Sequence, residues 1–322
     1  MRRILVTGAL GQIGSELVLA LRDRYGAESV VASDIKVVRA DQLSGNGPFE
    51  YVDCTSLRQL QEAVRKHRVG TIYHLAALLS AVAEEKPHVA WEVNMGGLYR
   101  VLEVARQAGC AVFFPSSIGA FGPCTPRQGT PQDTVQRPTT IYGVTKVSGE
   151  LLCDYYHRRF GVDTRGVRFP GLISHAAMPG GGTTDYAVEA FHGAIRYGRY
   201  TCFLAPQTRL DMMYMPDALA AAIGVMEADP ERLVHRNSFN VTAMNFTPEE
   251  LAAAIRTHQP DFAIDYRPDP VRQVIADSWP ESIDDSAAAE EWDWKPAWDL
   301  DGMTREMLDK LGERLRPSGE PC

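Results

Sequence analysis

The residues with the clearest chemical potential are a tyrosine and a lysine four positions apart, Tyr142 and Lys146. In a helix this spacing places both side chains on one face. A phenol with its ordinary pKa of about 10 is a poor base, but an adjacent ammonium favours the phenolate and lowers that pKa. The pair is therefore typical of a general base that takes the proton of an alcohol.

Two hydroxyl groups come shortly before this pair in the chain. Ser116 and Ser117 end the apolar run that starts at Phe113, and we expect them at the carboxyl edge of a strand. One of these hydroxyls can hydrogen-bond both a substrate oxygen and the phenol. We predict that one of these serines forms a catalytic group with Tyr142 and Lys146. The alternative is an aromatic residue packed on a helix beside a solvated lysine, since this spacing alone is common.

A glycine-rich segment near the amino terminus predicts dinucleotide binding. Gly8, Gly11 and Gly14 follow the apolar run 4–6 and precede an amphipathic pattern, which makes a strand, a tight turn and a helix. Such a turn directs backbone N–H groups and the positive helix end at a pyrophosphate. Gly8 permits the turn, Gly11 lets the backbone approach phosphate, and Gly14 lets the helix pack on the strand.

An acidic residue at the end of the second apolar run indicates which dinucleotide binds. Asp34 lies 20 residues beyond Gly14, where a carboxylate can accept hydrogen bonds from the adenosine ribose hydroxyls. Its charge would repel a 2′-phosphate, so we expect NAD rather than NADP, although Lys36 softens the repulsion. The alternative is a solvated acid at a strand end.

Composition limits the remaining classes of function. The chain has 322 residues, 45% of them apolar and 23% charged, as in an ordinary globular enzyme. Its net charge is −8 without a basic cluster, and no apolar run approaches the ~20 residues of a membrane span, so we expect neither nucleic acid nor membrane as a partner. Six scattered cysteines and eight histidines predict free thiols and no metal site. Because a strand follows Met1 almost at once, we expect no signal peptide and a cytoplasmic protein.

The chain as a whole predicts an α/β fold with a doubly wound parallel (Rossmann) sheet, because strand-like and helix-like segments alternate in its first half. We expect strands at 3–7, 29–33, 49–52, 71–74, 111–115 and 162–168. We expect helices at 12–24, 56–68, 84–108 and 140–160. The division predicted is a dinucleotide-binding domain over 1–170, to which 215–242 returns, and a smaller α/β substrate-binding domain over 171–316.

The second half gives weaker signals. The proline and three glycines at 179–182 interrupt regular secondary structure, which suggests a hinge. A short strand is expected at 238–241. Thr247 followed by Pro248 predicts the start of a helix, because the first can cap it and the second fits the first turn. A last helix is expected at 300–314, followed by a frayed tail.

Several motifs resemble the short-chain dehydrogenase/reductase superfamily, in particular its extended, UDP-galactose 4-epimerase-like branch. The glycine spacing Gly-x-x-Gly-x-x-Gly is similar, and segment 117–122 resembles the Ser-x-x-x-Tyr-Gly of those epimerases, with Ser117 at the catalytic serine. Segment 74–77 resembles the strand along the cofactor. The resemblance implies that NAD is contacted by Gly8, Gly11, Gln12, Ile13, Gly14, Asp34, Ile35, Asp53, Cys54, Leu75, Ala76, Ala77, Asn94, Tyr142, Lys146 and Phe169. Asp53 as a helix cap and Asn94 as a structural helix residue stay open.

Three further segments, 179–186, 209–217 and 278–286, resemble the short-chain L-threonine 3-dehydrogenases. That resemblance implies the NAD-dependent oxidation of L-threonine to 2-amino-3-ketobutyrate, a step of threonine catabolism. The implied substrate contacts are Ser80, Thr183, Thr184, Asp185 and Trp279. The residues alone leave two alternatives: Thr183 or Thr184 can cap a helix that starts near Asp185, and Trp279 can be a core aromatic.

The resemblance also implies a homodimer, formed through the two long helices at 84–108 and 140–160. Two alternative functions remain, a nucleotide-sugar 4-epimerase and a dinucleotide-binding protein without catalysis. Against the first, segment 117–119 lacks the Thr-Asp-Glu of dehydratases, and 168–171 lacks the asparagine that holds the uridine diphosphate in epimerases. Against the second, the predicted catalytic group is intact.

Overall fold

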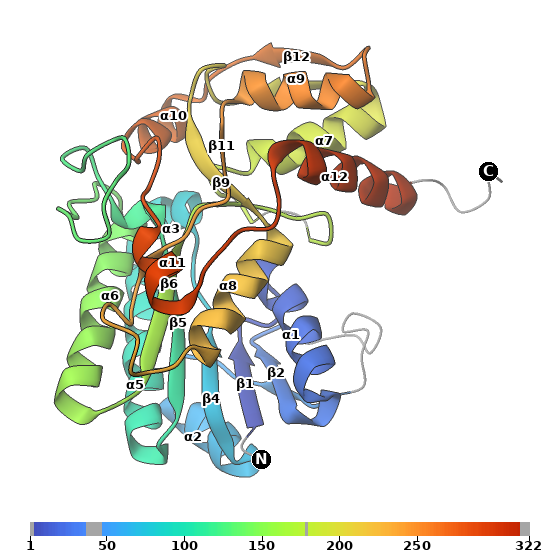
Figure 1. The fold of residues 1–322 in the computed structure, drawn as a ribbon. Helices are drawn as coiled ribbons and strands as arrows, with labels where there is room; N and C mark the ends of the chain where they lie inside the picture. Colours follow the sequence, from blue (N-terminus) through green and yellow to red (C-terminus); the bar gives the residue numbers. More distant parts are fainter. Residues whose placement is uncertain (1–2, 37–46, 178–179, 316–322) are drawn as a thin grey trace.

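A seven-stranded parallel sheet forms the base of the molecule (Figure 1). The structure is a computed structural model, and it describes residues 3–36, 47–177 and 180–315. The sheet order is β10-β6-β5-β4-β1-β2-β3. The strands are β1 (Arg3–Thr7), β2 (Val30–Asp34), β3 (Phe49–Tyr51), β4 (Val69–His74), β5 (Ala111–Ser117), β6 (Thr164–Phe169) and β10 (Phe239–Asn240). The predicted doubly wound sheet is confirmed, and its order reverses between β1 and β4, where such sheets bind ligands.

Helices cover both faces of this sheet because successive strand residues point to opposite sides. Val6 packs against α1 (Gln12–Tyr25) and α8 (Met215–Glu227), which share one core. Leu5 faces the other core, which contains α2 (Leu57–His67), α5 (Gly97–Ala108) and α6 (Ile141–Phe160). Two 3₁₀ turns, Ala27–Ser29 and Ile118–Ala120, complete this half.

The single helix predicted at 84–108 is wrong. The chain instead forms α3 (Ser80–Glu85), α4 (Pro87–Trp91), a π-helical turn (Glu92–Gly96) and then α5. Pro87 causes the first break, because a residue before proline is pushed out of the helical region and Lys86 has φ −133° and ψ 60°. The chain before this break forms α3, whose first residue, Ser80, lines the cavity described below.

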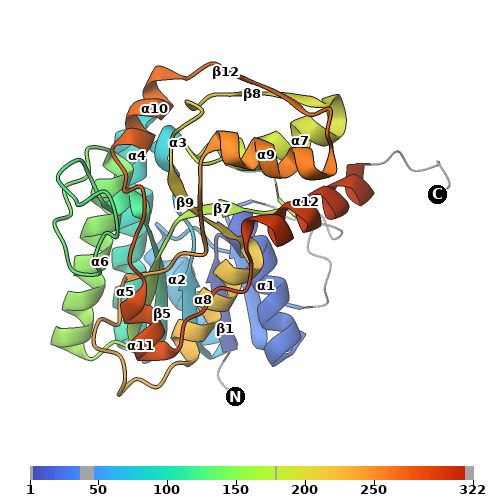
Figure 2. The same cartoon turned by 45° about the horizontal axis from the view of Figure 1, so that its top comes forward.

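The second half builds a separate layer above the carboxyl ends of the strands (Figure 2). It contains a three-stranded sheet, β11 (Met244–Phe246), β9 (Leu210–Tyr214) and β7 (Gly171–Ile173), and the parallel pair β8 (Arg199–Cys202) and β12 (Ala263–Tyr266). Its helices are α7 (Tyr186–Tyr197), α9 (Pro248–His258), α10 (Pro270–Asp277) and α12 (Leu300–Leu315), while α11 (Ser286–Trp292) packs against the large sheet beside β10. Thr247 caps α9 in a complete capping box, as its sequence predicts.

The chain crosses between the two layers more than once. Within 215–242, α8 packs against α1 and β6, and β10 pairs with β6 in the large sheet. The domain boundary at residue 170 stays a prediction. Pro179 of the predicted hinge and the predicted frayed tail 316–322 lie outside the described residues.

Candidate active site

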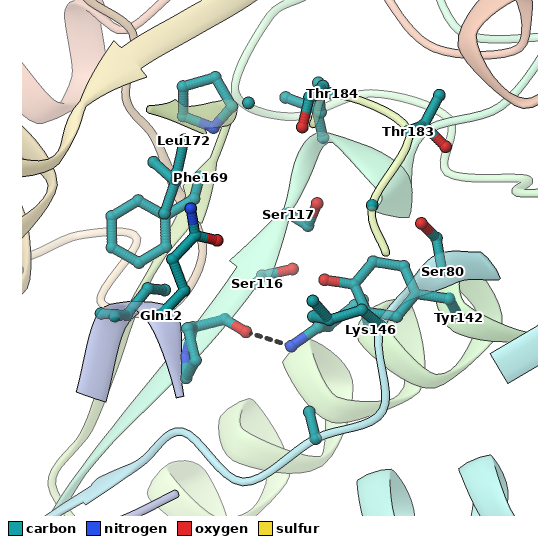
Figure 3. A pocket seen from close by; sticks show the side chains of 18 of the residues that line it. Gln12, Ser80, Ser116, Ser117, Tyr142, Lys146, Phe169, Leu172, Thr183 and Thr184 are labelled. Carbon is teal, nitrogen blue, oxygen red and sulfur yellow. Dashed lines mark hydrogen bonds between the residues drawn. The ribbon is translucent and has the colours of Figure 1, made fainter. Parts of the chain in front are cut away.

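A cavity of about 140 Å³ lies at the carboxyl ends of the parallel strands, beneath the second layer. Figure 3 shows that the side chains of Ser117, Tyr142 and Lys146 gather on one side of it. The loop with Thr183 and Thr184 faces them. The position fits the rule that open α/β sheets bind ligands where the strand order reverses.

Two local features place the predicted catalytic group. Ser117 ends β5, and Tyr142 lies in the first turn of α6, which starts after its cap, Thr140. The Thr140 hydroxyl accepts the Gly143 N–H at 3.0 Å. Lys146 follows one turn later, and its Nζ lies 5.4 Å from the centre of the Tyr142 ring. The structure therefore brings the three predicted side chains together.

The electrostatics of this group differ from the sequence-based expectation. Burial raises the pKa of Tyr142 to about 12, opposed by its hydrogen bond with Ser117. Burial also lowers the pKa of Lys146 to about 8. The Lys146 ammonium donates to the Pro115 carbonyl oxygen at 2.6 Å instead of binding the phenol. The expected lowering of the phenol pKa is therefore absent in the protein alone, because desolvation outweighs the nearby charge.

The glycine turn has the shape that a pyrophosphate requires. Gly8 has φ +69°, and a Cβ on it would lie 2.7 Å from the Ala76 nitrogen. A Cβ on Gly14 would lie 2.2 Å from the Gly8 carbonyl oxygen, while one on Gly11 would meet that oxygen at 3.2 Å. Gly11 precedes α1 without any side-chain cap, so the first N–H groups of this helix remain available to a phosphate. The Gln12 Nε2 is buried without a partner at the cavity.

Asp34 is buried, not solvated, and it organises this turn. Its Oδ2 accepts the Leu10 N–H at 3.0 Å, and its Oδ1 accepts the Lys36 N–H at 3.1 Å. Each carboxylate oxygen can accept a second hydrogen bond, so both can still serve ribose hydroxyls. Ile35 beside it is 58% exposed, as a residue that only flanks a bound adenosine would be.

The remaining predicted cofactor residues occupy several positions around the turn. Asp53 is not the cap of α2, because Ser56 caps that helix and the Asp53 carboxylate instead accepts the Thr55 N–H at 2.8 Å. Asn94 bonds the Leu78 backbone and the Thr145 hydroxyl, so it ties the chain after β4 to the catalytic helix. Cys54 is buried against α5, and the residues on the cavity itself are Gln12, Ile13, Leu75, Ala77 and Phe169.

The predicted substrate residues all line the cavity. Thr183 and Thr184 do not cap α7, whose first turn receives no side-chain cap. The Thr183 hydroxyl is instead buried without a partner. The Asp185 carboxylate accepts hydrogen bonds from the N–H groups of two residues that precede it, Gly181 at 2.8 Å and Gly182 at 2.6 Å. Burial raises the pKa of this carboxylate to about 6. Trp279 is buried at the cavity wall. Arg127 donates hydrogen bonds to the Glu281 carboxylate and the Asp277 carbonyl oxygen, on either side of Trp279 in the chain.

Two kinds of residue escaped the sequence reasoning. The first are apolar wall residues with no chemical signature, Leu79, Ile118, Pro170 and Leu172. The second is a buried ion pair between Glu150 and Arg168 behind the cavity. Its signal in the sequence was a glutamate four residues after Lys146, which continues the spacing of Tyr142 and Lys146. Across the described ranges, no helix is long and apolar enough to cross a membrane, and no cluster of three metal-ligating side chains occurs.

Comparison with known proteins gives consistent matches. Residues 4–242 match the model of the NAD dependent epimerase/dehydratase family. An uncharacterized epimerase/dehydratase of Staphylococcus haemolyticus is 55% identical over 98% of this chain and 99% of its own. The solved L-threonine dehydrogenase of Clostridium difficile is 56% identical, with a TM-score of 0.95 over 98% of both chains. A monomeric L-threonine 3-dehydrogenase from a metagenome is 44% identical, with a TM-score of 0.93 over 97% of this chain and 100% of its own.

Proposed function

The chain belongs to the NAD-dependent epimerase/dehydratase family, and we propose that it oxidises the side-chain hydroxyl of L-threonine to 2-amino-3-ketobutyrate with NAD. The observation that supports threonine as the substrate is the composition of the cavity. It is about 140 Å³ in volume, and among its described lining residues Asp185 is the sole carboxylate and Lys146 the sole cation. A small zwitterion fits a short site with one carboxylate for its ammonium.

The nucleotide-sugar alternative fits this cavity poorly. Pockets for larger ligands occupy roughly 300–1,000 Å³, and a sugar nucleotide needs a long polar trench. The Thr183–Asp185 segment and Trp279 line this small space. The epimerase reading is therefore the weaker one.

Each member of the catalytic group has a distinct role in this proposal. When bound, NAD supplies a nicotinamide ring that accepts a hydride from the carbon that bears the hydroxyl. Tyr142 takes the proton of the substrate hydroxyl, and Ser117 orients that hydroxyl toward the phenol. The Lys146 ammonium stabilises the phenolate as it forms. Ser80, Thr183 and Thr184 donate hydrogen bonds to the polar groups of the amino acid across the cavity.

A spectrophotometric assay tests this function directly. The purified protein is incubated with NAD and a panel of amino acids and UDP-hexoses, and NADH is followed by its absorbance. We expect NADH with L-threonine and less with L-serine, because one methyl group in a pocket contributes about 1–3 kcal/mol. Interconversion of UDP-hexoses without NADH formation would make the protein an epimerase, and no turnover of any compound would favour a purely binding role.

Asp34 is expected to set the cofactor preference. Replacing it in Asp34→Ala removes charge-assisted hydrogen bonds to the ribose hydroxyls, of about 1–3 kcal/mol, together with its repulsion of a 2′-phosphate. We expect the ratio of kcat/KM for NAD to that for NADP to fall about 10-fold or more. Asp34→Asn is the matched control for the loop, because an amide oxygen can still accept the Leu10 N–H at similar size. An unchanged ratio in both variants would remove Asp34 from the cofactor site.

We also propose that two chains associate through α5 and α6. Leu151, Tyr155 and Phe160 on α6 are 62%, 53% and 42% exposed, and Tyr99 on α5 is 52% exposed. Large apolar side chains gathered on neighbouring helices indicate a covered surface. Leu151→Arg is expected to convert a dimer to a monomer in sedimentation velocity, while the exposed Val271→Arg on α10 is not. A wild-type monomer at micromolar concentration would refute this interface.

A cytoplasmic location is part of the same proposal. In the described part of the chain Cys54, Cys153 and Cys202 are buried free thiols, and Cys124 is an exposed one. Free thiols persist in reducing compartments.

A further inference from the structure

A buried ion pair lies one helical turn beyond Lys146. Glu150 and Arg168 are 4% and 6% exposed. The guanidinium donates from Nε to Oε1 at 3.1 Å and from Nη2 to Oε2 at 2.9 Å, which is a bidentate arrangement. Tyr142, Lys146 and Glu150 follow one another at four-residue spacing, so they share one face of α6.

Further hydrogen bonds connect this pair to the walls of the active site. The Ser116 hydroxyl donates to Glu150 Oε1, and Gln136 Nε2 donates to Oε2 at 2.8 Å. Arg168 Nη1 also donates to the Asn240 Oδ1 at 3.1 Å. Both oxygens of the carboxylate are thus held by two donors each, which fixes its position.

Three further titratable groups around the Lys146 ammonium are uncharged at neutral pH. From β4, His74 has a pKa lowered to about 3 by burial and by Lys146 itself. On α6, burial raises the pKa of Tyr142 to about 12 and raises that of Cys153 as well. Glu150 attracts the ammonium and opposes the effect of its burial. Arg168 is the ion-pair partner of the Glu150 carboxylate and is positively charged.

We infer that Glu150 is a positioning residue of the reaction: its charge holds Lys146 protonated beside Tyr142, and its bond to Ser116 fixes the strand end that carries Ser117. Arg168 makes the burial of this carboxylate possible, because a buried charge needs a partner. The inference rests on the proposed oxidation for its catalytic meaning. The electrostatic part concerns the protein alone and can be measured without substrate.

Removal of the negative charge of Glu150 is expected to change the pKa values of its neighbours in one direction. A nearby negative charge makes loss of a proton harder, so Glu150→Gln lowers the pKa of Lys146 and also that of Tyr142. The high-pH limb of the pH profile of kcat/KM for threonine, where Lys146 loses its proton, is therefore expected to move to lower pH by about half a unit to one unit. Glu150→Asp keeps the charge and is expected to stay close to the wild type.

The direct measurement is an NMR titration of lysine labelled with ¹³C at Cε, in the protein without ligands. The chain has six lysines, and Lys146→Arg identifies the signal of interest. We expect Lys146 to titrate near pH 8 in the wild type and at least about half a unit lower in Glu150→Gln. Glu103→Gln is the matched control, because Glu103 contacts the same helix through the Tyr156 hydroxyl at 2.7 Å, away from the cavity.

A second variant keeps the test valid if Glu150→Gln does not fold. Glu150→Gln leaves a buried guanidinium unpaired, which is strongly destabilising. The double variant Glu150→Gln/Arg168→Gln removes both charges, and Lys146 is expected to titrate below the wild-type value in it too, with a smaller displacement.

Two results would overturn the inference. One is a wild-type titration of Lys146 in a folded variant that lacks the Glu150 charge. The other is a pH profile that falls uniformly without moving, which would leave Glu150 a purely structural role. A displaced Lys146 titration in a protein that does not oxidise threonine would instead contradict the proposed function alone.

Discussion

Tyr142→Phe is expected to lower kcat for threonine oxidation by about 10²-fold or more while NAD binding stays within about twofold of the wild type. The substitution keeps the buried ring against α3 and α4 and deletes only the group that accepts the proton. At neutral pH Lys146 is largely protonated, below its pKa of about 8, and Asp185, the one carboxylate of the described lining, is assigned to the substrate ammonium. Stopped-flow or steady-state measurement of NADH formation gives kcat, and calorimetry gives the Kd for NAD.

A second tyrosine provides the matched control for this experiment. Tyr73 is also buried, on β4 in the core shared with α1, and its hydroxyl lies outside the cavity. Tyr73→Phe should retain kcat near the wild-type value. Near-normal turnover in Tyr142→Phe would mean that another group accepts the proton, and the catalytic assignment would be abandoned.

Asp185→Asn is expected to raise KM for threonine by about 10- to 100-fold with little change in the Kd for NAD. A hydrogen bond between charged groups contributes roughly 1.5–3 kcal/mol, which corresponds to this change in affinity. The amide can still accept one N–H of the Gly181–Gly182 turn, so the loop keeps part of its anchoring. Glu189→Gln is the matched control, since Glu189 lies one turn later on α7 and bonds the Tyr200 hydroxyl at 2.8 Å.

The same assignment predicts a pH dependence. Burial raises the pKa of Asp185 to about 6, so its carboxylate is present above that pH and protonated below it. KM for threonine should therefore rise as the pH falls through 6 in the wild type, and this rise should be absent in Asp185→Asn. An equal rise in both proteins would place the titrating group elsewhere.

The sequence by itself determined the elements whose signals are local. The turn at Gly8 to Gly14 and the cap of α9 at Thr247 are signalled by neighbouring residues, and both occur where expected. The helix predicted at 140–160 is α6 within one residue, because its cap and periodic apolar positions lie within the helix itself. Chemical types at the right spacing also led to the prediction of Tyr142 and Lys146, while Ser117 rather than Ser116 was chosen from the resemblance to the epimerases.

Contacts between distant segments decided the rest. Strands such as β7 have only three residues and form because β9, about 40 residues later, supplies the hydrogen bonds. The Glu150–Arg168 pair joins α6 to β6, and no spacing rule announces the partner of a buried charge. The high pKa of Tyr142 likewise follows from its burial against α3 and α4. Burial depends on what the whole chain packs against a group, so only the tertiary structure sets the charges with which this site works.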